Sequence, residues 1–246
     1  MVPIYANKEP VMTNQKTLIL GANSGIAKAL AQQLVSSANN DVIIVSRDVK
    51  FYQHQRFNQA KVIKIKNYSE QDIEKAIDDI KEISEGRISR VFICHGVLHN
   101  DEIQPEKRLE DFSAHAFLSI LSANTITPML WLKHLTPLIS GKFICKVTVF
   151  TARVGSITDN KLGGWYSYRA SKTAMNMLLK SAAVELSRRA KNIKLISFHP
   201  GTTDTPLSQP FHKNVAEGKL FTPEYVANQL LNIVEDVSVD GEVSYL

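Results

Sequence analysis

The sequence has few of the features that mark several large classes of protein. Among its 246 residues only Cys94 and Cys145 are cysteines, and each lies in an apolar run, with no CxxC motif and no metal-ligand spacing. We therefore expect no disulfide framework and no metal site, but two buried free thiols in a reducing, cytoplasmic setting. No apolar run approaches the length of a membrane span, so we expect no membrane association.

Concentrated charge, linkers and repeats are also missing. The net charge of +5 is modest, and the basic residues form no run with interleaved aromatic residues, which argues against a nucleic-acid partner. Residues 1–14 lack the apolar core and cleavage site of a signal peptide and are predicted to be an N-terminal extension. With no internal repeat and no linker rich in Pro, Gly or Ser, residues 15–246 are predicted to form one domain.

Buried strand patterns alternate with helical patterns along the whole chain. The apolar runs are continuous, which is typical of strands covered on both faces of a parallel sheet. We predict an α/β fold: a single-domain, doubly wound Rossmann fold with a mainly parallel six- to seven-stranded sheet flanked by helices. Predicted strands are 17–20, 41–46, 62–65, 91–94, 143–151, 193–198 and 242–246, and predicted helices are 26–35, 69–83, 111–135, 168–190 and 222–235. The third helix is expected to break near Pro128 or to end before Pro137.

In a doubly wound sheet, ligands bind at the carboxyl ends of the strands, so the loop after each strand is inspected first. Two glycines four residues apart follow the first predicted strand and precede a helix. The first glycine allows a tight turn, and the second lets the backbone approach a pyrophosphate at the helix N-terminus. A plain strand-to-helix turn would also explain them. The expected phosphate-site residues are Gly21, Asn23, Ser24, Gly25 and Ile26.

The second strand ends at Ser46 and Arg47, where a dinucleotide site would place the adenosine ribose. No acidic residue stands at the strand end to bind a 2′-hydroxyl, and Arg47 can pair with a 2′-phosphate, which favours NADP(H) over NAD(H). A solvated surface arginine is the alternative. After the third strand, Asn67 is expected to reach the adenine edge, or to be an ordinary loop residue.

Two further groups of loop residues are candidates for the site. His95 and Gly96, after the fourth strand, are expected beside a ribose. After the sixth strand, Pro200 and Gly201 form a turn, and Thr203 and Thr205 offer hydroxyls and amides to a carboxamide or a phosphate.

Asn124 is unusual because asparagine competes for backbone groups inside a helix. Among Leu, Ile and Met it is expected to be bound to something, although a kink before Pro128 would also explain it.

Tyr168 and Lys172 are four residues apart, so they lie on one face if the segment is helical. An ammonium close to a phenol stabilises the phenolate, and we expect the pKa of Tyr168 to fall below its ordinary value near ~10. Such a tyrosine can act as a general acid or base near neutral pH. The same spacing is common on ordinary helices, and Tyr166 has Ala170 rather than lysine four residues later.

Taken together and in this order, the glycine loop, Asn124, the Tyr168–Lys172 pair and Pro200-Gly201 resemble the short-chain dehydrogenase/reductase family, from about Thr17 to the C-terminus. The motifs around Gly155, Gly163 and His199 look more narrowly like its C-factor branch, which includes the carbonyl reductase Sniffer. The resemblance implies one Rossmann domain, a nicotinamide cofactor and a homodimer or homotetramer. It also implies that Tyr168 is the general acid/base, that Lys172 lowers its pKa and binds the nicotinamide ribose, and that Asn124 holds a water in a proton relay.

The chain departs from that family at three places. The serine that orients the substrate carbonyl would fall at Ala152, so Thr151 is taken as the substitute, with Ser156 as a further candidate. Ala27 replaces the third glycine, which the pattern tolerates, and His95 replaces a small residue beside the cofactor.

The predicted function is an NADP(H)-dependent oxidoreductase that interconverts a small-molecule carbonyl and a secondary alcohol. The alternative is a dinucleotide-binding, C-factor-like signalling or sensor protein with weak or no turnover. The segment 206–221 is expected over the substrate cleft, with Phe211 and Phe221 suggesting an apolar lid.

Overall fold

The chain folds around one parallel β-sheet, seen in a computed structural model that describes residues 15–37 and 40–246. The sheet has seven strands in the order β3-β2-β1-β4-β5-β6-β9, as predicted. The predicted extension 1–14 lies outside the described residues. The strands are β1 (Gln15–Leu20), β2 (Asn40–Ser46), β3 (Lys61–Lys64), β4 (Ile88–Ile93), β5 (Cys145–Phe150), β6 (Ile193–Phe198) and β9 (Ser244–Tyr245).

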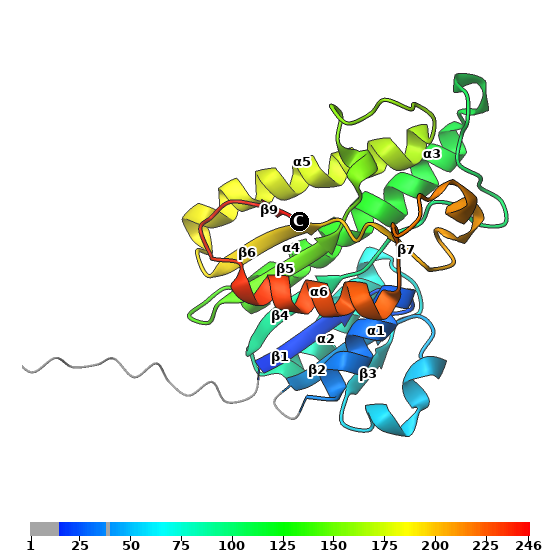
Figure 1. Cartoon of the computed structure of the whole chain (residues 1–246). Coiled ribbons are helices and arrows are strands. Elements are labelled where there is room, and N and C mark those ends of the chain that lie inside the picture. Colours follow the sequence, from blue (N-terminus) through cyan, green and yellow to red (C-terminus); the bar gives the residue numbers. More distant parts are fainter. Residues whose placement is uncertain (1–14, 38–39) are drawn as a thin grey trace, which may run out of the picture.

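Helices cover both faces of the sheet (Figure 1). Helices α1 and α6 lie side by side on one face, and α2, α4 and α5 pack on the other. Helix α3 packs beside α5 rather than on the sheet. The helices are α1 (Gly25–Val35), α2 (Glu70–Ser84), α3 (Ala114–Leu121), α4 (Thr127–Ile139), α5 (Tyr166–Arg189) and α6 (Pro223–Asp236).

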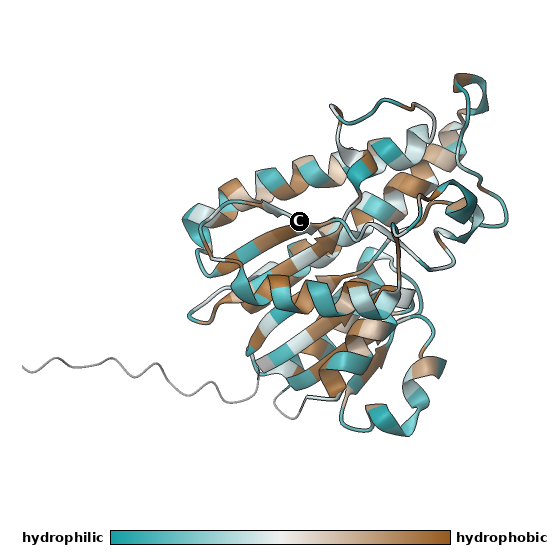
Figure 2. Cartoon of the chain, viewed as in Figure 1, coloured by the Kyte–Doolittle hydropathy of each residue, from teal (hydrophilic) through white to brown (hydrophobic). Residues whose placement is uncertain are grey.

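Each strand supplies side chains to two separate cores because successive residues of a strand point to opposite faces. In β1, Leu18 and Leu20 join the core beneath α2, α4 and α5, while Ile19 joins the core beneath α1 and α6. Apolar residues therefore predominate along the strands and point to both faces, with a few buried polar residues such as Thr148 and Ser197 between them (Figure 2). This double burial is the reason why continuous apolar runs predicted a parallel sheet.

The sheet order changes direction at β1, whose neighbours are β2 and β4. The chain winds outward from β1 to β3 and then returns to β4 on the other side. The loops after β1 and β4 therefore diverge, which leaves a crevice at their carboxyl ends where doubly wound folds bind ligands. Within the described residues, none of the helices combines the length and apolarity required to cross a bilayer.

The middle helical region is interrupted close to Pro128, as expected, but it does not end before Pro137. The interruption is a π-helical turn (Ser122–Ile126) that joins α3 to α4. Pro128 lies at the start of α4, where a missing N–H removes no obligatory bond. Pro137 is tolerated near the exposed end of α4, and Ser140 N–H still bonds to Thr136 O at 3.0 Å. A π-turn holds one more residue than an α-helical turn, so the helix is widened around Asn124 and not at a proline.

Several short elements were not predicted from the sequence. They are the 3₁₀ turns η1 (Lys50–Gln53), η2 (Gln55–Phe57), η3 (Leu109–Asp111), η5 (Arg153–Gly155) and η6 (Gln209–Asn214), and the two-stranded pair β7 (Thr202–Thr203) and β8 (Leu220–Phe221). The pair β7–β8 closes the segment 204–219 into a loop beside the carboxyl edge of the sheet.

Candidate active site

Tyr168 and Lys172 lie in the first two turns of α5, on the face that points into the molecule. Their side chains are 8% and 2% exposed, and Lys172 Nζ lies 5.9 Å from the centre of the Tyr168 ring. The spacing of four residues thus places both groups on one buried helix face, as expected.

The Lys172 ammonium is held by the ends of two central strands. Its Nζ donates to Phe150 O, at the end of β5, at 2.9 Å and lies 3.5 Å from His95 O, just beyond β4. These two carbonyls lie at the carboxyl edge of the sheet. A buried ammonium requires such partners, because an unpaired charge in the interior is strongly destabilising.

The pKa of Tyr168 differs from the value expected from the sequence. Burial raises the pKa of Tyr168 to about 12 and lowers the pKa of Lys172 to about 8. The expected fall in the pKa of Tyr168 is therefore wrong for the protein as it stands. The physical reason is that desolvation disfavours the phenolate, while the ammonium is bonded to carbonyls and lies 5.9 Å from the ring.

Asn124 joins the loop after β4 to helix α5. Val97 N–H donates to its Oδ1 at 2.7 Å, and its Nδ2 donates to Val97 O at 2.8 Å and to Ser171 Oγ at 3.0 Å. The fully buried amide thus takes the place of a neighbouring strand for Val97. The prediction that this asparagine is bound to something is confirmed; its role in a water relay stays a prediction.

The Thr151 hydroxyl points toward β6. It lies 2.9 Å from Ser197 Oγ and 3.2 Å from Phe198 O. Because Ser197 Oγ donates its single proton to Asn176 Oδ1 at 2.9 Å, the Thr151 proton goes either to Ser197 Oγ or to Phe198 O. Its proton is therefore used inside the fold.

Two neighbouring positions complete the region in which the family has its serine. Ala152 has extended backbone angles and a methyl side chain that cannot donate a hydrogen bond. Ser156 is half-buried, and its Oγ makes only 3.3 Å contacts, with Thr158 Oγ1 and Asp159 N. Of the three positions, Ser156 has the hydroxyl least committed to other partners.

The loop after β1 has the form of a phosphate-binding turn. Gly21 has φ +69°, a conformation that favours glycine, and Ser24 Oγ caps α1 by accepting from Ala27 N at 3.2 Å. Asn23 is exposed, whereas the Ile26 side chain packs into the core. A Cβ on Gly25 would lie 3.0 Å from the Thr205 methyl, so the loop after β6 packs directly against this turn.

At the end of β2, Arg47 is exposed and its guanidinium stacks on the Tyr68 ring, 4.9 Å from the centroid. Two predicted neighbours use their side chains locally. Ser46 is fully buried and donates to Asp48 O at 2.7 Å, and Asn67 Oδ1 accepts from Ser69 N at 2.6 Å. Their predicted contacts with a cofactor remain predictions.

His95 fills the space between the glycine loop and Tyr68. A Cβ on Gly21 would lie 2.9 Å from His95 Cε1, and the Tyr68 ring meets the imidazole edge-on at 4.4 Å. The imidazole is 8% exposed, and its buried Nε2 has no hydrogen-bond partner among the residues that the structure describes. Burial, together with the charges of Arg47 and Lys172, lowers the pKa of His95 to about 3, so the ring is neutral at physiological pH.

The polar groups of the turn after β6 mostly form hydrogen bonds with one another. Gly201 has φ +66° and packs against the Phe221 ring, Thr203 Oγ1 donates to Pro200 O at 3.1 Å, and Thr205 Oγ1 donates to Thr203 O at 3.3 Å. Phe221 therefore belongs to the fold and not to a lid. Phe211, by contrast, lies over the site, with its ring 4.8 Å from Trp165 and 6.0 Å from His99.

The sequence analysis missed Trp165 and His99. The Trp165 ring lies 6.2 Å from that of Tyr168, and His99 Nε2 lies 3.1 Å from Leu207 O in the loop that carries Phe211. The Gly163-Gly164 pair before Trp165 was the available signal, because it marks a sharp turn into α5.

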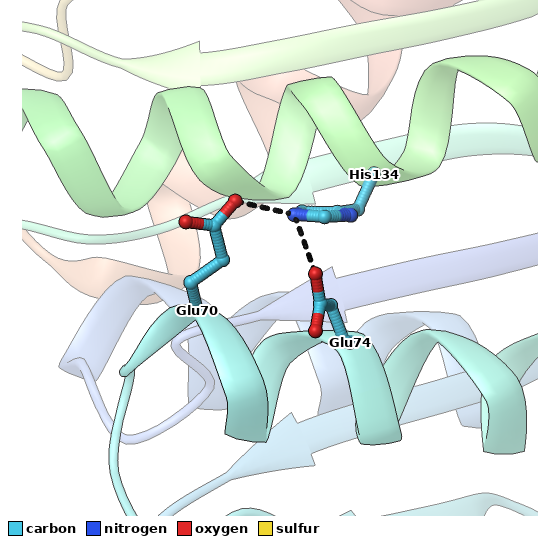
Figure 3. Close-up of side chains that lie close together, drawn as sticks. All are labelled: Glu70, Glu74 and His134. Atoms are coloured by element: carbon cyan, nitrogen blue, oxygen red, sulfur yellow. Dashed lines mark hydrogen bonds and ion pairs between the residues drawn. The ribbon is translucent and has the colours of Figure 1, made fainter.

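A second group of titratable side chains lies away from this site, between α2 and α4 (Figure 3). His134 Nε2 lies 3.0 Å from Glu70 Oε1 and 3.8 Å from Glu74 Oε1. These are metal-ligating residue types, but Glu70 Oε1 also accepts from Lys133 Nζ at 2.5 Å. Hydrogen bonds from Lys133 and His134 lower the pKa of Glu70, and the group ties the two helices together.

The fold and the site define a class: a nicotinamide-dinucleotide oxidoreductase with a tyrosine and a lysine at the carboxyl edge of a doubly wound sheet. A family model described as short chain dehydrogenase matches residues 15–216. The chain belongs to the short-chain dehydrogenase/reductase family, whose members interconvert alcohols and carbonyl compounds.

Two relatives of known sequence agree with this assignment. The chain is 23% identical over 239 residues to "Benzil reductase ((S)-benzoin forming)" of Bacillus cereus, covering 89% of this chain and 93% of the relative. It is 31% identical over 87 residues to the C-signal of Myxococcus xanthus, covering 35% of this chain and 51% of the relative.

Solved structures share the fold. The carbonyl reductase Sniffer of D. melanogaster superposes with a TM-score of 0.78 at 19% identity, covering 94% of this chain and 96% of that chain. An NADPH-bound carbonyl reductase from chicken fatty liver gives a TM-score of 0.76 at 19% identity, covering 95% and 97%. The predicted family is thus confirmed, and the C-signal and Sniffer are both among the proteins to which the chain is similar.

The low pKa of His95 predicts a loss of stability in acid. The unfolded chain binds a proton at this residue below its ordinary value of 6.5, whereas the folded chain binds it only near about 3, so stability falls as the pH falls through this window. From about pH 7 to about pH 5, His95 should lower the free energy of unfolding by about 2 kcal/mol.

Urea unfolding of the parent protein and of His95→Ala at both pH values would measure this effect. The variant should show a pH dependence that is weaker by that amount, whatever its stability at neutral pH. Equal pH dependences in the two proteins would contradict the prediction.

Proposed function

We propose that this protein is an NADP(H)-dependent oxidoreductase that interconverts a small-molecule carbonyl and a secondary alcohol, with Tyr168 as the general acid/base. The observation that carries the proposal is the buried Tyr168–Lys172 pair at the carboxyl edge of the sheet, beside the glycine loop. Because burial keeps the phenol protonated at neutral pH, Tyr168 is ready to donate a proton to a carbonyl oxygen.

The residues around the crevice fit a dinucleotide. The fit rests on the tight turn at Gly21, the first turn of α1, and the unpartnered buried Nε2 of His95, which offers a neutral hydrogen-bonding group. A Cβ on Gly96 would lie 3.7 Å from Lys172 Nζ, so only a small residue leaves the space in front of the lysine open. The remaining expected cofactor contacts are Asn23, Ser24, Gly25, Ile26, Ser46, Arg47, Asn67, Pro200, Gly201, Thr203 and Thr205.

In reduction, Tyr168 donates its proton to the carbonyl oxygen, and the charge left on the phenolate is stabilised by the Lys172 ammonium. When bound, the nicotinamide supplies the hydride. Lys172 is anchored by Phe150 O and His95 O, so the ammonium has a defined position before a substrate arrives. Asn124 ties Val97, in the loop after β4, to Ser171, the residue that precedes Lys172 in α5.

A second candidate function is a dinucleotide-dependent sensor or signalling protein with little turnover. The observation in its favour is the lack of a free hydroxyl donor at Thr151 and Ala152, where the family orients the carbonyl. Under the leading proposal, Ser156 supplies that hydrogen bond. Oxidation of NADPH by purified protein across a panel of ketones and aldehydes separates the two, because tight cofactor binding without oxidation would favour the sensor.

Replacement of Tyr168 by phenylalanine tests the mechanism. We expect the rate of carbonyl reduction by Tyr168→Phe to fall by about 10²–10⁴-fold because the general acid is lost. The affinity for NADPH, measured by fluorescence titration, should change little, since the ring remains. Tyr166→Phe is the matched control and should retain the parent rate; a Tyr168→Phe enzyme with the parent rate would refute the assignment.

Replacement of Arg47 by alanine tests the cofactor preference. If Arg47 pairs with the 2′-phosphate, Arg47→Ala should weaken NADPH binding by about 10–100-fold, the value of a charge-assisted hydrogen bond, and leave NADH binding nearly unchanged. Arg87→Ala, which removes the same charge at the opposite edge of the sheet, is the control. Equal affinities of the parent protein for NADPH and NADH would contradict the proposed pairing of Arg47 with the 2′-phosphate.

The candidate interface for the oligomer expected from the resemblance lies on α3, the π-helical turn after it, and α5. Helices α3 and α5 pack together, and the apolar side chains of Leu118, Ile126, Met177, Leu178 and Val184 are all more than a third exposed. An apolar surface of this kind is typical of a contact between subunits. We infer that two copies pair through it. A cytoplasmic location, which the two buried thiols favour, is also part of the proposal.

A charged residue in this surface should prevent pairing. Met177 is 65% exposed, so Met177→Asp should leave the fold intact and convert a dimeric protein into a monomer in sedimentation equilibrium experiments. Leu162→Asp, at a 92% exposed position outside α3 and α5, should leave the assembly unchanged. A monomeric parent protein at micromolar concentration would show that the inferred interface is wrong.

A further inference from the structure

A buried carboxylate lies at the N-terminus of the helix that carries Tyr168. Glu106, in the long loop after β4, is only 5% exposed. The Ser167 N–H points at both of its oxygens, at 3.3 Å each, and the Ser167 hydroxyl donates to Oε1. A glutamate is rarely buried to this degree unless its oxygens are bonded, so these contacts account for its position.

Helix α5 lacks a capping side chain of its own. Its N-cap residue, Trp165, has φ 53° and provides no side-chain hydrogen bond to the first turn. The two preceding glycines also have positive φ, so the chain turns sharply into the helix. The N–H groups of a first turn need acceptors from elsewhere, and they favour an anion. Glu106 provides both from sixty-one residues away in the chain.

The backbone of Glu106 holds the other side of the same turn. Its carbonyl oxygen accepts from Trp165 N–H at 2.6 Å, and a Cβ on Gly164 would lie 3.2 Å from this oxygen. Glu106 therefore fixes Trp165 through its main chain and Ser167 through its side chain. Tyr168 follows directly, and its ring lies 6.2 Å from that of Trp165.

Two contacts thus bind the loop after β4 to the helices around Tyr168 and Lys172. Val97, near its beginning, is bound by Asn124, and Glu106 is bound to the first turn of α5. His95, which lies just before this fastened stretch, accepts through its carbonyl oxygen from Lys172. The position of the first turn of α5, which carries Tyr168, relative to the loop after β4 therefore depends on Glu106.

We propose that Glu106 is a positioning residue for Tyr168, which sets the location of the phenol by capping α5 at Ser167 and Trp165. The inference rests on the proposed role of Tyr168 as general acid/base. Glu106 itself transfers no proton and touches no substrate. It acts by the geometry of the first turn of α5, to which the rate of a positioned proton transfer is sensitive.

The test compares Glu106→Ala with Glu106→Gln, since glutamine keeps an acceptor for Ser167 without the charge. For each variant we would measure kcat and KM for a ketone that the parent reduces, the Kd for NADPH, and the pH profile of kcat. Glu106→Ala should lower kcat by about 10–100-fold with little change in the Kd for NADPH. Glu106→Gln should restore most of the loss, and neither variant should move the pH profile.

A readout independent of activity comes from the two tryptophans. Trp131 is fully buried in the core, whereas Trp165 is half-buried beside Glu106. In a Trp131→Phe background, Glu106→Ala should shift the emission of Trp165 to longer wavelength, and Glu106→Gln should not. If Glu106→Ala does not fold, Ser167→Ala, which removes only the hydroxyl contact, should show a smaller loss of kcat in the same direction.

Parent-like kcat and parent-like Trp165 emission in Glu106→Ala, or in Ser167→Ala when the first variant cannot be obtained, would overturn the proposal. An equal loss in the alanine and glutamine variants would also overturn it, because the hydrogen-bond acceptor would then not be the cause. The Tyr168→Phe variant distinguishes a failure of the proposed function from a failure of this inference. If Tyr168→Phe stays active, Tyr168 is not the general acid. The Trp165 emission then still reports whether Glu106 holds the first turn of α5 in place.

Discussion

The structure depends on one buried ammonium at the meeting point of three elements. Lys172 extends from α5 to the carboxyl ends of β4 and β5, where Phe150 O and His95 O accept hydrogen bonds from its ammonium group. A charge in the interior is tolerated only when its hydrogen bonds are made, so the helix cannot slide along the sheet without losing them. The same contacts bring Tyr168 to the crevice between the diverging loops after β1 and β4, where the family binds its cofactor.

Burial controls the chemistry of the residues in this region more than charge pairing does. It holds Tyr168 protonated, lowers the pKa of Lys172 to about 8, and keeps His95 uncharged at neutral pH. Each shift has the direction in which desolvation acts on that type of group. The Lys172 ammonium can stabilise a phenolate once one forms beside it; before that, burial keeps Tyr168 protonated.

Long-range polar contacts, rather than loop sequence, define the shape of the site. Asn124 binds Val97, Glu106 binds Ser167, and Thr151 continues a hydrogen-bond chain through Ser197 to Asn176. None of these pairs is close in the sequence, and side-chain type alone does not select a partner. For this reason the sequence suggested that Thr151 orients the substrate carbonyl, although its hydroxyl is bonded between β5 and β6. For the same reason nothing in the sequence indicated the role of the buried Glu106.

The fold class, the order of the elements and the helix face shared by Tyr168 and Lys172 were all predictable from the amino-acid sequence. These features follow from local periodicity, because continuous apolar runs require burial on both faces and a spacing of four residues places two side chains on one side of a helix. The direction of the pKa shifts, the π-turn at Asn124, the packing of His95 on Gly21 and the cap at Glu106 became visible only in the folded chain. Desolvation and hydrogen-bond partners depend on segments that meet only after folding.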